Sequence, residues 1–534
     1  MAITIIQAGA ALQLLDDAGG LTTLTLPAGV TLRTNTPPRW AVFNNNVVLV
    51  NTPSQPLTID ASGAVRILTP KPPRLAPILA GVSAGTLVGK YFAKETYVTQ
   101  DTAGNILSES DYSPQSNTVV LASQLLGVSN ADISPDAITL RRFYRTTDQG
   151  VVLFQWVDLD GNILTTIQDG LADAALSLVG SPVLGTPPRL TTIAEFRGRL
   201  WGVGDVDIDT LRYTEAGVQY AWATDNTILV PGKGADVFGV VALIPRREAL
   251  GVGRRNLLAQ VTGTGVESNG NIDFDIPILS RELGIESQES VCVFRDTAYF
   301  LWKDGVYAWG PAGITCVSDG VAGVGAVRSW FVTNSYFNQD LFSLAFAHID
   351  PSRPGYRLFL ASAGSSVVDS WIEYNIADQT WWGPHRTTLF SPTTAFNRTN
   401  GADKSIPLIG SAHYLVGEQE VRTDGSLTSA TGIALNVVGK RHDLGASDSE
   451  KYWGELSLLG KPQSSGVLTV TASPGTAETN RPMTQQYDMT KSRQRLGRMG
   501  HGITNALTLT NNNEGEDVEV YGYIIDPVNE LGRR

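Results

Sequence analysis

The sequence predicts an all-β protein: a β-propeller-like body, an inserted immunoglobulin-like sandwich and a C-terminal β-domain. Three observations predict this class. Apolar runs are short, about four to seven residues, and many of them end at Asp-Gly, Asn-Gly or Ser-Gly pairs. A helical pattern is present only at 118–127 and 245–259. Two Pro-Pro-Arg sequences enclose a segment of roughly 100 residues that consists of strand-like runs, and this length is that of one sandwich domain.

Glycine-bearing pairs mark the expected reversals of the chain. Such pairs tolerate the positive φ angles of tight hairpins, so each one predicts a turn between two strands. The pairs are Asp160-Gly161, Asn269-Gly270, Asp304-Gly305 and Asp424-Gly425. The clearest hairpin spans 297–309, where both faces of the first strand are apolar, as in strands that are buried on both sides.

One stretch has the order of a propeller blade. Residues 357–361, 370–375 and 380–382 read as strand, loop, strand, short turn and aromatic strand. Related, degenerate units lie at 39–68, 196–215 and 411–424. No strict period survives, so the number of blades stays open, and a stack of sandwiches is the alternative.

Paired prolines indicate the domain boundaries, because they favour extended backbone and exclude helix and central strand. Pro-Pro-Arg occurs at 37–39, 72–74 and 187–189. We predict N-terminal strands and the first part of the body at 1–74, the inserted sandwich at 75–185, and the rest of the body at 186–435. The composition changes near 436, so a separate β-domain is expected at 436–534, with strands at 453–459, 467–472, 505–510 and 517–525.

Composition narrows the classes of function. The hydrophobic fraction of 42% can fill several cores, whereas the charged fraction of 17% lies below the usual level of about 25%. A net charge of −12 gives no bulk attraction for nucleic-acid phosphates, although DNA can slide along such a surface without sticking. Two cysteines, Cys292 and Cys316, exclude a disulfide scaffold and a Cys-rich zinc site. We expect both to be reduced core residues; a pair between neighbouring strands is the alternative.

The N-terminus has no leader pattern, and no run of eighteen apolar residues predicts a membrane-spanning helix. Catalytic motifs are also missing, so we predict no enzymatic activity, no cofactor and no metal. The histidines are far apart in the sequence, at positions 348, 385, 413, 442 and 501. Asp158, Asp160 and Asn162 resemble the opening of a calcium loop, but the expected glutamate is missing, which favours a hairpin turn.

Two charged segments remain. Asp205, Asp207 and Asp209 would share a face of a strand, where we favour a solvated edge over a cation or arginine partners. In the basic run 491–498, a strand would place Lys491, Arg493 and Arg495 on one face, with Arg498 and His501 beyond. We favour a subunit interface over contact with DNA phosphates for this run. The pairs Arg246-Arg247 and Arg254-Arg255 are open between the same two roles.

Several segments resemble a known family, the tail nozzle or packaged-DNA stabilisation proteins of short-tailed phages. An Arg-Leu-Trp strand and a Tyr-x-Glu-x-Gly turn lie in 195–217, and Ser-Arg-Glu-Leu-Gly at 280–284 leads to the hairpin of 296–320. The segments 440–460, 495–502 and 519–534 are similar to the family's C-terminal domain, and 90–176 resembles fibronectin type III modules. The 245–270 stretch departs from the family pattern.

The resemblance implies a virion protein of the phage tail that forms a hexameric ring below the portal and the head-to-tail adaptor. Such a ring would close the DNA channel, retain the packaged double-stranded DNA without tight or sequence-specific binding, and allow its ejection. Two other functions stay open. In a receptor- or carbohydrate-binding tail protein, Trp381 and Trp382 would stack on sugars; in a propeller glycosidase, paired acids would hydrolyse them.

Overall fold

The chain is described here by a computed structural model that covers residues 4–16, 20–34, 36–50, 52–53, 55–163, 166–176, 180–232, 239–265, 267–268, 271–320, 326–333, 336–386, 391–399, 405–411, 415–417, 423–426, 429–432, 435–438, 449–463, 465–475, 482–502, 504–511 and 520–533. It divides into two compact units, Met1–Glu418 and Gln419–Arg534. Nearly all of the regular structure is antiparallel β-sheet, which confirms the predicted all-β class. Among the described residues, no helix is both long and apolar enough to cross a membrane.

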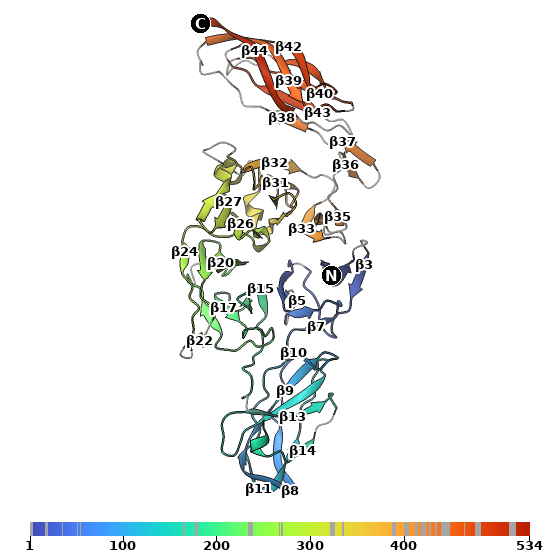
Figure 1. Cartoon of the computed structure of the whole chain (residues 1–534), viewed down its shortest axis with the longest axis vertical. Coiled ribbons are helices and arrows are strands. Elements are labelled where there is room, and N and C mark those ends of the chain that lie inside the picture. Colours follow the sequence, from blue (N-terminus) through green and yellow to red (C-terminus); the bar gives the residue numbers. More distant parts are fainter. Residues whose placement is uncertain are drawn as a thin grey trace. The chain divides into compact units, whose positions relative to one another are not determined.

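Seven sheets of the first unit follow one another along the chain and form its body (Figure 1). Five of them are four-stranded and antiparallel, and their strands pair in chain order; in one of the five, a separate small hairpin precedes the last strand. The first four sheets consist of β1 (Thr4–Ala8), β2 (Ala11–Leu15) and β3 (Leu21–Leu24); β4 (Arg39–Phe43), β5 (Asn46–Val50), β6 (Leu57–Ile59) and β7 (Val65–Ile67); β15 (Leu190–Phe196), β16 (Arg199–Gly204), β17 (Thr210–Tyr213) and β18 (Thr227–Leu229); and β19 (Ala242–Pro245), β20 (Leu250–Arg254), β21 (Leu257–Val261) and β24 (Ile278–Ser280).

The remaining three sheets complete the body. They consist of β25 (Cys292–Phe294), β26 (Thr297–Trp302), β27 (Gly305–Gly310) and β28 (Gly313–Cys316); β29 (Phe346–Ile349), β30 (Gly355–Leu360), β31 (Ser370–Asn375) and β32 (Thr380–Arg386); and β33 (Pro392–Thr399), β34 (Ser405–Ser411) and β35 (Leu415–Gly417). A small hairpin, β22 (Glu267–Ser268) and β23 (Asn271–Ile272), extends from the fourth sheet. The short helices are η2 (Gln288–Ser290), η3 (Val317–Asp319), α1 (Arg328–Val332) and η4 (Gln339–Leu344).

Each body sheet packs on the next through a separate hydrophobic core. Trp201 on β16 lies fully buried in the core between the third and fourth sheets. Phe300 on β26 occupies the next core, and Tyr356 on β30 the one after it. Because every inner sheet is covered on both sides, its strands are apolar on both faces, as the 297–309 sequence predicts. Burial of this kind is the main favourable term that holds the sheets together.

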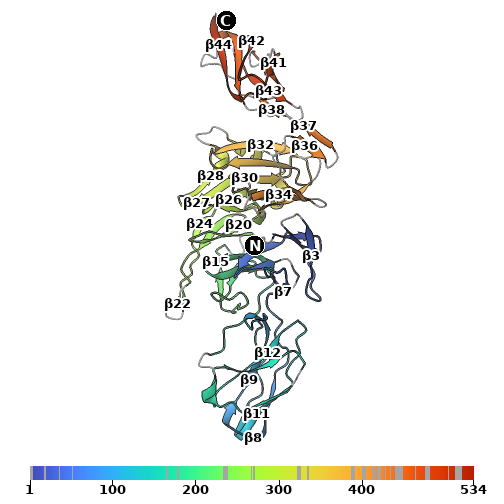
Figure 2. The ribbon, with the colours of Figure 1, turned by 45° about the vertical axis from the view of Figure 1, so that its right-hand side comes forward.

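The inserted segment forms a two-sheet sandwich (Figure 2). One sheet has the order β10-β9-β12-β13 and the other β14-β11-β8, and a single core that includes Phe143 and Trp156 lies between them. Its strands are β8 (Ile78–Tyr91), β9 (Ala93–Gln100), β10 (Ile106–Glu109), β11 (Val119–Ser129), β12 (Leu140–Arg145), β13 (Phe154–Asp160) and β14 (Ile167–Asp169), with one short helix, η1 (Asp173–Ala175).

The second unit also contains two sheets around one core, which includes Trp453 and Met499. The orders are β38-β43-β40-β41 and β42-β39-β44, and the hairpin β36–β37 forms a further small sheet. Its strands are β36 (Thr423–Ser426), β37 (Ser429–Gly432), β38 (Leu435–Val438), β39 (Ser449–Gly460), β40 (Val467–Ala472), β41 (Met483–Asp488), β42 (Arg493–Gly502), β43 (Leu507–Asn511) and β44 (Val520–Arg533).

Several local predictions are wrong. The helical patterns at 118–127 and 245–259 form strands. Residues 245–259 belong to a sheet that is covered by cores on both sides, and Leu121 and Leu126 of 118–127 pack into the core of the sandwich. Asp304-Gly305 joins β26 to β27 as predicted. Asp160-Gly161 only ends β13, since the next strand pairs in the other sheet, and Asp424-Gly425 lies inside β36. Asn269-Gly270 lies outside the described residues.

Candidate functional site: an arginine ladder in the C-terminal unit

The predicted basic run forms an exposed row on β42. Arg493, Arg495 and Arg498 are all exposed, and we call these three residues the arginine ladder. His501 follows them, also exposed, with its ring 5.7 Å from the ring of Tyr452. Lys491 precedes the strand and lies in a turn, where its Nζ is 3.4 Å from Asp488 Oδ2. The prediction that Lys491 shares the strand face is therefore wrong, because the strand begins at Arg493.

A glycine bulge brings the ladder onto one face. Positions 495 and 498 are an odd number apart, so a regular strand would direct their side chains to opposite sides. The register between β42 and β39 shifts at this point, and Gly497 has a φ of +100°. After the shift, Arg498 lies opposite Glu455 on β39, and Arg495 Nη1 lies 3.3 Å from the Glu455 carboxylate. Arg495 therefore pairs with Glu455, and Arg498 occupies the position opposite the same acid.

The ladder carries more positive charge than its neighbours neutralise. Arg495 is 74% exposed and shares Glu455, which is itself 41% exposed. Both units carry net negative charge, and most of it lies in the first. Residues 1–418 contain 28 Lys and Arg against 38 Asp and Glu, and residues 419–534, which include the ladder, contain 12 against 14. Exposed guanidinium groups at this spacing can bind carboxylates or phosphates through charge-assisted hydrogen bonds, and such contacts weaken with salt.

Other charged residues that the sequence singles out have structural roles. The segment with Asp205, Asp207 and Asp209 is a loop between β16 and β17 and not a strand. Asp205 lies 3.3 Å from Arg189, and Asp209 accepts a hydrogen bond from Arg254, whose side chain is fully buried. The expected solvated edge is therefore wrong for Asp205 and Asp209, because arginines from distant segments neutralise them.

The second arginine-rich stretch is likewise used within the fold. Arg246 lies over the ring of Trp309, with 4.5 Å between the guanidinium carbon and the ring centroid, and it also pairs with Asp296. Arg255 lies 3.8 Å from Glu286. Arg246, Arg254 and Arg255 are poorly suited to bind phosphates, because each already has an acidic partner inside the unit, whereas Arg247 is exposed.

Two residues of the segment that resembles a calcium loop stabilise the sandwich. Asp158 accepts two hydrogen bonds from Arg142, at 2.8 and 2.9 Å, and Asn162 bonds both backbone groups of Ser134. Among the described residues, no group of three or more His, Cys, Asp or Glu is arranged to hold a metal.

The aromatic and sulfur-bearing residues are distributed as follows. Trp381 donates to Val317 O at 3.0 Å and packs on a core, so it is unavailable for stacking on a sugar, whereas Trp382 is 61% exposed. Cys292 and Cys316 are free thiols on β25 and β28, separated by two strands. Burial raises the pKa of the Cys292 thiol to about 12.

Each histidine whose side chain the structure describes has an aromatic ring as its neighbour. His348 is buried and stacks on Phe359, with 6.0 Å between ring centroids. His385 stacks on Trp371, and burial lowers the pKa of His385. His413 and His442 lie outside the residues whose side chains the structure describes.

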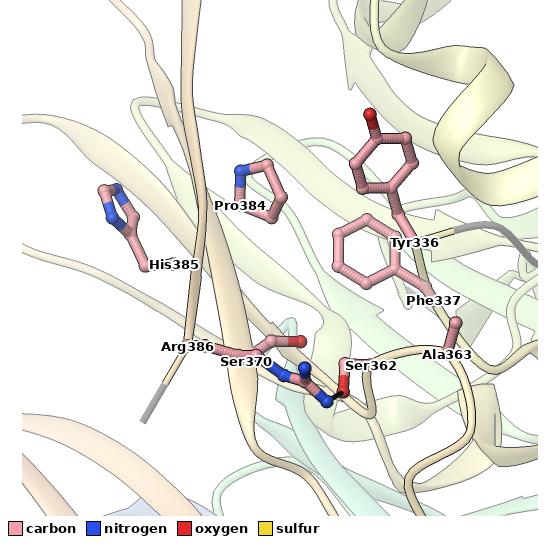
Figure 3. A pocket seen from close by; sticks show the side chains of 8 residues that line it. All are labelled: Tyr336, Phe337, Ser362, Ala363, Ser370, Pro384, His385 and Arg386. Carbon is pink, nitrogen blue, oxygen red and sulfur yellow. Dashed lines mark hydrogen bonds between the residues drawn. The ribbon is translucent and has the colours of Figure 1, made fainter. Parts of the chain in front are cut away.

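A small pocket is formed by residues that belong to no sequence motif. Its cavity of about 210 Å³ is lined by Tyr336, Phe337, Ser362, Ala363, Ser370, Pro384, His385 and Arg386. Figure 3 shows Tyr336 and Phe337 facing Pro384 across the pocket, with Arg386 bonded to Ser362 below them. These residues come from three separate segments, so no spacing in the sequence could have predicted them.

Comparisons with known proteins show no family. No family model matches the sequence, and no curated protein matches it. A solved exo-β-1,3-galactanase from Phanerochaete chrysosporium with galactose aligns over 98% of this chain and 100% of its own, at 7% identity and a TM-score of 0.18. An apocarotenoid oxygenase from Synechocystis aligns over 70% and 66%, at 7% identity and a TM-score of 0.21. At TM-scores this low, the likeness carries no argument about fold or function.

Proposed function

We propose that the chain is a structural protein of a short phage tail, located at the end of the tail tube. It forms a hexameric ring that closes the DNA channel, retains the packaged DNA and lets it pass on infection. The sequence segments 195–217, 296–320 and 440–460 support this proposal by their resemblance to tail nozzle proteins. The observation that carries the proposal within the structure is the arginine ladder, an exposed row of positive charge on a chain of net charge −12.

The body suits a mechanical role. Seven sheets stack in chain order through closed cores, and we propose that they complete a propeller, with the inserted sandwich as a fibronectin III-like module. Close-packed cores of this kind resist deformation, so each subunit is a rigid part of the ring. An acidic surface makes few counterion-releasing contacts with DNA, and DNA can therefore slide past it.

In the proposed ring, the ladder of one subunit binds the acidic first unit of its neighbour. Residues 1–418 hold most of the chain's excess negative charge, which makes a second copy of this chain the natural partner. Because the ladder is exposed, salt weakens its electrostatic attraction for the neighbouring subunit. We expect its loss to weaken assembly and to leave the unfolding free energy of the subunit nearly unchanged.

Charge reversal tests the ring. Arg493→Glu, Arg495→Glu and Arg498→Glu together should leave the purified chain monomeric by mass photometry, whereas the unaltered chain gives a six-subunit mass that dissociates as NaCl rises from about 0.1 to 1 M. A control chain with Arg74→Glu, Lys90→Glu and Arg281→Glu undergoes the same change in charge at other exposed sites and should assemble normally.

Three outcomes count against the proposal. If the ladder variant assembles like the control, the ladder is not the interface between subunits. If it assembles but loses retention of double-stranded DNA in reconstituted particles, the ladder faces DNA instead. A wild-type chain that stays monomeric at all concentrations contradicts the ring itself.

A further inference from the structure

We propose that the pocket beside β32 binds one ring of a neutral saccharide. The pocket belongs to the first unit and the arginine ladder to the second, and the proposed function of the pocket is independent of ring assembly. Three features of the pocket support this ligand: a polar side with balanced charge, an apolar side formed by ring-shaped side chains, and a volume that fits one sugar ring.

The polar side is a fixed network of donors and acceptors. Asp369 accepts hydrogen bonds from the backbone and the hydroxyl of Ser362, both at 2.7 Å. Arg386 Nη2 bonds the Ser362 hydroxyl and lies 3.2 Å from Asp369. Because the carboxylate balances the guanidinium, the pocket has little net charge, which favours a neutral ligand over an anion.

Arg386 retains the capacity to bind a ligand. Its side chain is 61% exposed, and its hydrogen bonds in this network use Nη2 alone out of a group with five N–H donors. Ser370 lies opposite Arg386 in the sheet and adds a second hydroxyl, which donates to Leu360 O and can still accept. A sugar hydroxyl both donates and accepts hydrogen bonds, and the polar side of the pocket offers acceptors and donors next to each other.

The apolar side is formed by Tyr336 and Pro384, which face each other across the pocket in Figure 3. Tyr336 is 46% exposed, and its ring is held 5.1 Å from the ring of Trp330. The base is Phe337, which is fully buried. The C–H faces of a pyranose pack well on such flat rings, whereas a fully charged ligand would lose hydration against them.

The volume sets the size and the affinity of the ligand. At about 210 Å³ the cavity is smaller than the range of roughly 300–1,000 Å³ that is typical of drug-sized ligands, so it accommodates one ring of a longer glycan. With so few contacts we expect a Kd on the order of 1 mM. None of the described residues that line the pocket is a carboxylate, and Asp369 behind Ser362 is ion-paired with Arg386. Hydrolysis by two acids is therefore not expected here.

Saturation-transfer NMR on the intact chain tests the site. The probes are methyl glycosides of glucose, galactose and N-acetylglucosamine at millimolar concentration. We expect at least one of them to receive transfer, and Tyr336→Ala or Arg386→Gln to reduce that signal at least fivefold. Trp382→Ala is the matched control, because this exposed indole is on the same strand but does not line the pocket.

Each alternative outcome overturns the proposal. Absence of transfer to all three glycosides with the unaltered chain means that the pocket does not take a sugar ring of these classes. A signal that survives in both pocket variants and disappears in Trp382→Ala places the sugar on the exposed indole. Hydrogen exchange in β29 to β32 verifies that each variant retains its fold, since Tyr336 and Arg386 are largely outside the cores.

Discussion

At the scale of single residues, Glu95 on β9 is a carboxyl group with no exposed surface. Its Oε2 accepts a hydrogen bond from the Asp132 backbone at 3.0 Å, and its Oε1 lies 4.0 Å from Arg141 Nη1. Burial raises the pKa of Glu95 to about 7 from its usual value of 4.5. The folded sandwich therefore holds a proton on Glu95 at pH values where the unfolded chain has released it.

This pKa shift predicts how stability depends on pH. The contribution of protonated Glu95 is fully present below pH 4.5 and is lost as the pH rises through about 7. The side chain in Glu95→Gln stays neutral at every pH. The unfolding free energy of the unaltered chain minus that of the variant should therefore fall by about 3 kcal/mol as the pH rises from 4.5 to 7. Urea-dependent hydrogen exchange of the β9 and β12 amides measures it. A difference that is constant from pH 4 to 8 would disprove the assignment.

Residue roles were the hardest part to predict. The sequence shows three alternating aspartates at 205–209, but the arginine that neutralises Asp209 lies on β20, far along the chain. Pairing of this kind depends on tertiary contacts, which local periodicity does not encode. The pocket of Tyr336, Ser362 and Arg386 also depends on tertiary contacts between distant segments, so it could not be predicted from the sequence. The exposed arginine ladder was easier, because its residues are consecutive neighbours on one strand.

At the scale of elements, the bulge at Gly497 decides which way Arg498 points. Gly497→Ala should lower the unfolding free energy of the second unit by about 1–2 kcal/mol, since a side chain at φ +100° is strained. The new Cβ would also lie 3.3 Å from Gln485 Nε2. Thermal unfolding followed by circular dichroism measures this change.

The same variant should weaken ring assembly, because a strand without the bulge directs Arg498 away from Arg495. Gly204→Ala provides the comparison: Gly204 does not have a left-handed φ, and an added Cβ meets its nearest neighbours at 3.7 Å. Equal loss of stability in the two variants would show that the bulge bears no strain.

Elements were predicted well where both faces of a strand are apolar, as at 297–309. They were missed where an apolar run was long enough to resemble a helix, as at 245–259. That stretch forms three short strands because the β19–β24 sheet is covered on both sides. Asp424-Gly425 failed for a different reason: both residues pair with residues of β37, so they lie within the strand and not at its end.

At the scale of the whole molecule, the sandwich leaves and re-enters the body at neighbouring points. The Thr69 hydroxyl lies 3.5 Å from Tyr220 O, and Gly185 packs so closely that an added Cβ would lie 2.0 Å from Trp222 O. The sandwich itself has a complete core of its own. Both linkers therefore meet one short segment between β17 and β18.

Replacing residues 75–185 by Gly-Ser-Gly should therefore leave the body folded, with its near-ultraviolet circular dichroism largely retained. The body cores do not include residues of the sandwich, so they lose no packing. Removal of residues 239–280 is the comparison and should abolish folding, because two cores share those strands. An aggregated chain after the first replacement alone would contradict this division of the unit.

The adjoining attachment points of Thr69 and Gly185 also determine how force travels. Tension along the body bypasses the sandwich, because the chain enters and leaves it at nearly the same place. A pull on the sandwich, in turn, divides between the two linkers, which contact the same segment between β17 and β18, so neither linker bears the whole load. Force on the sandwich, or proteolysis within it, should therefore leave the stacked sheets of the body folded.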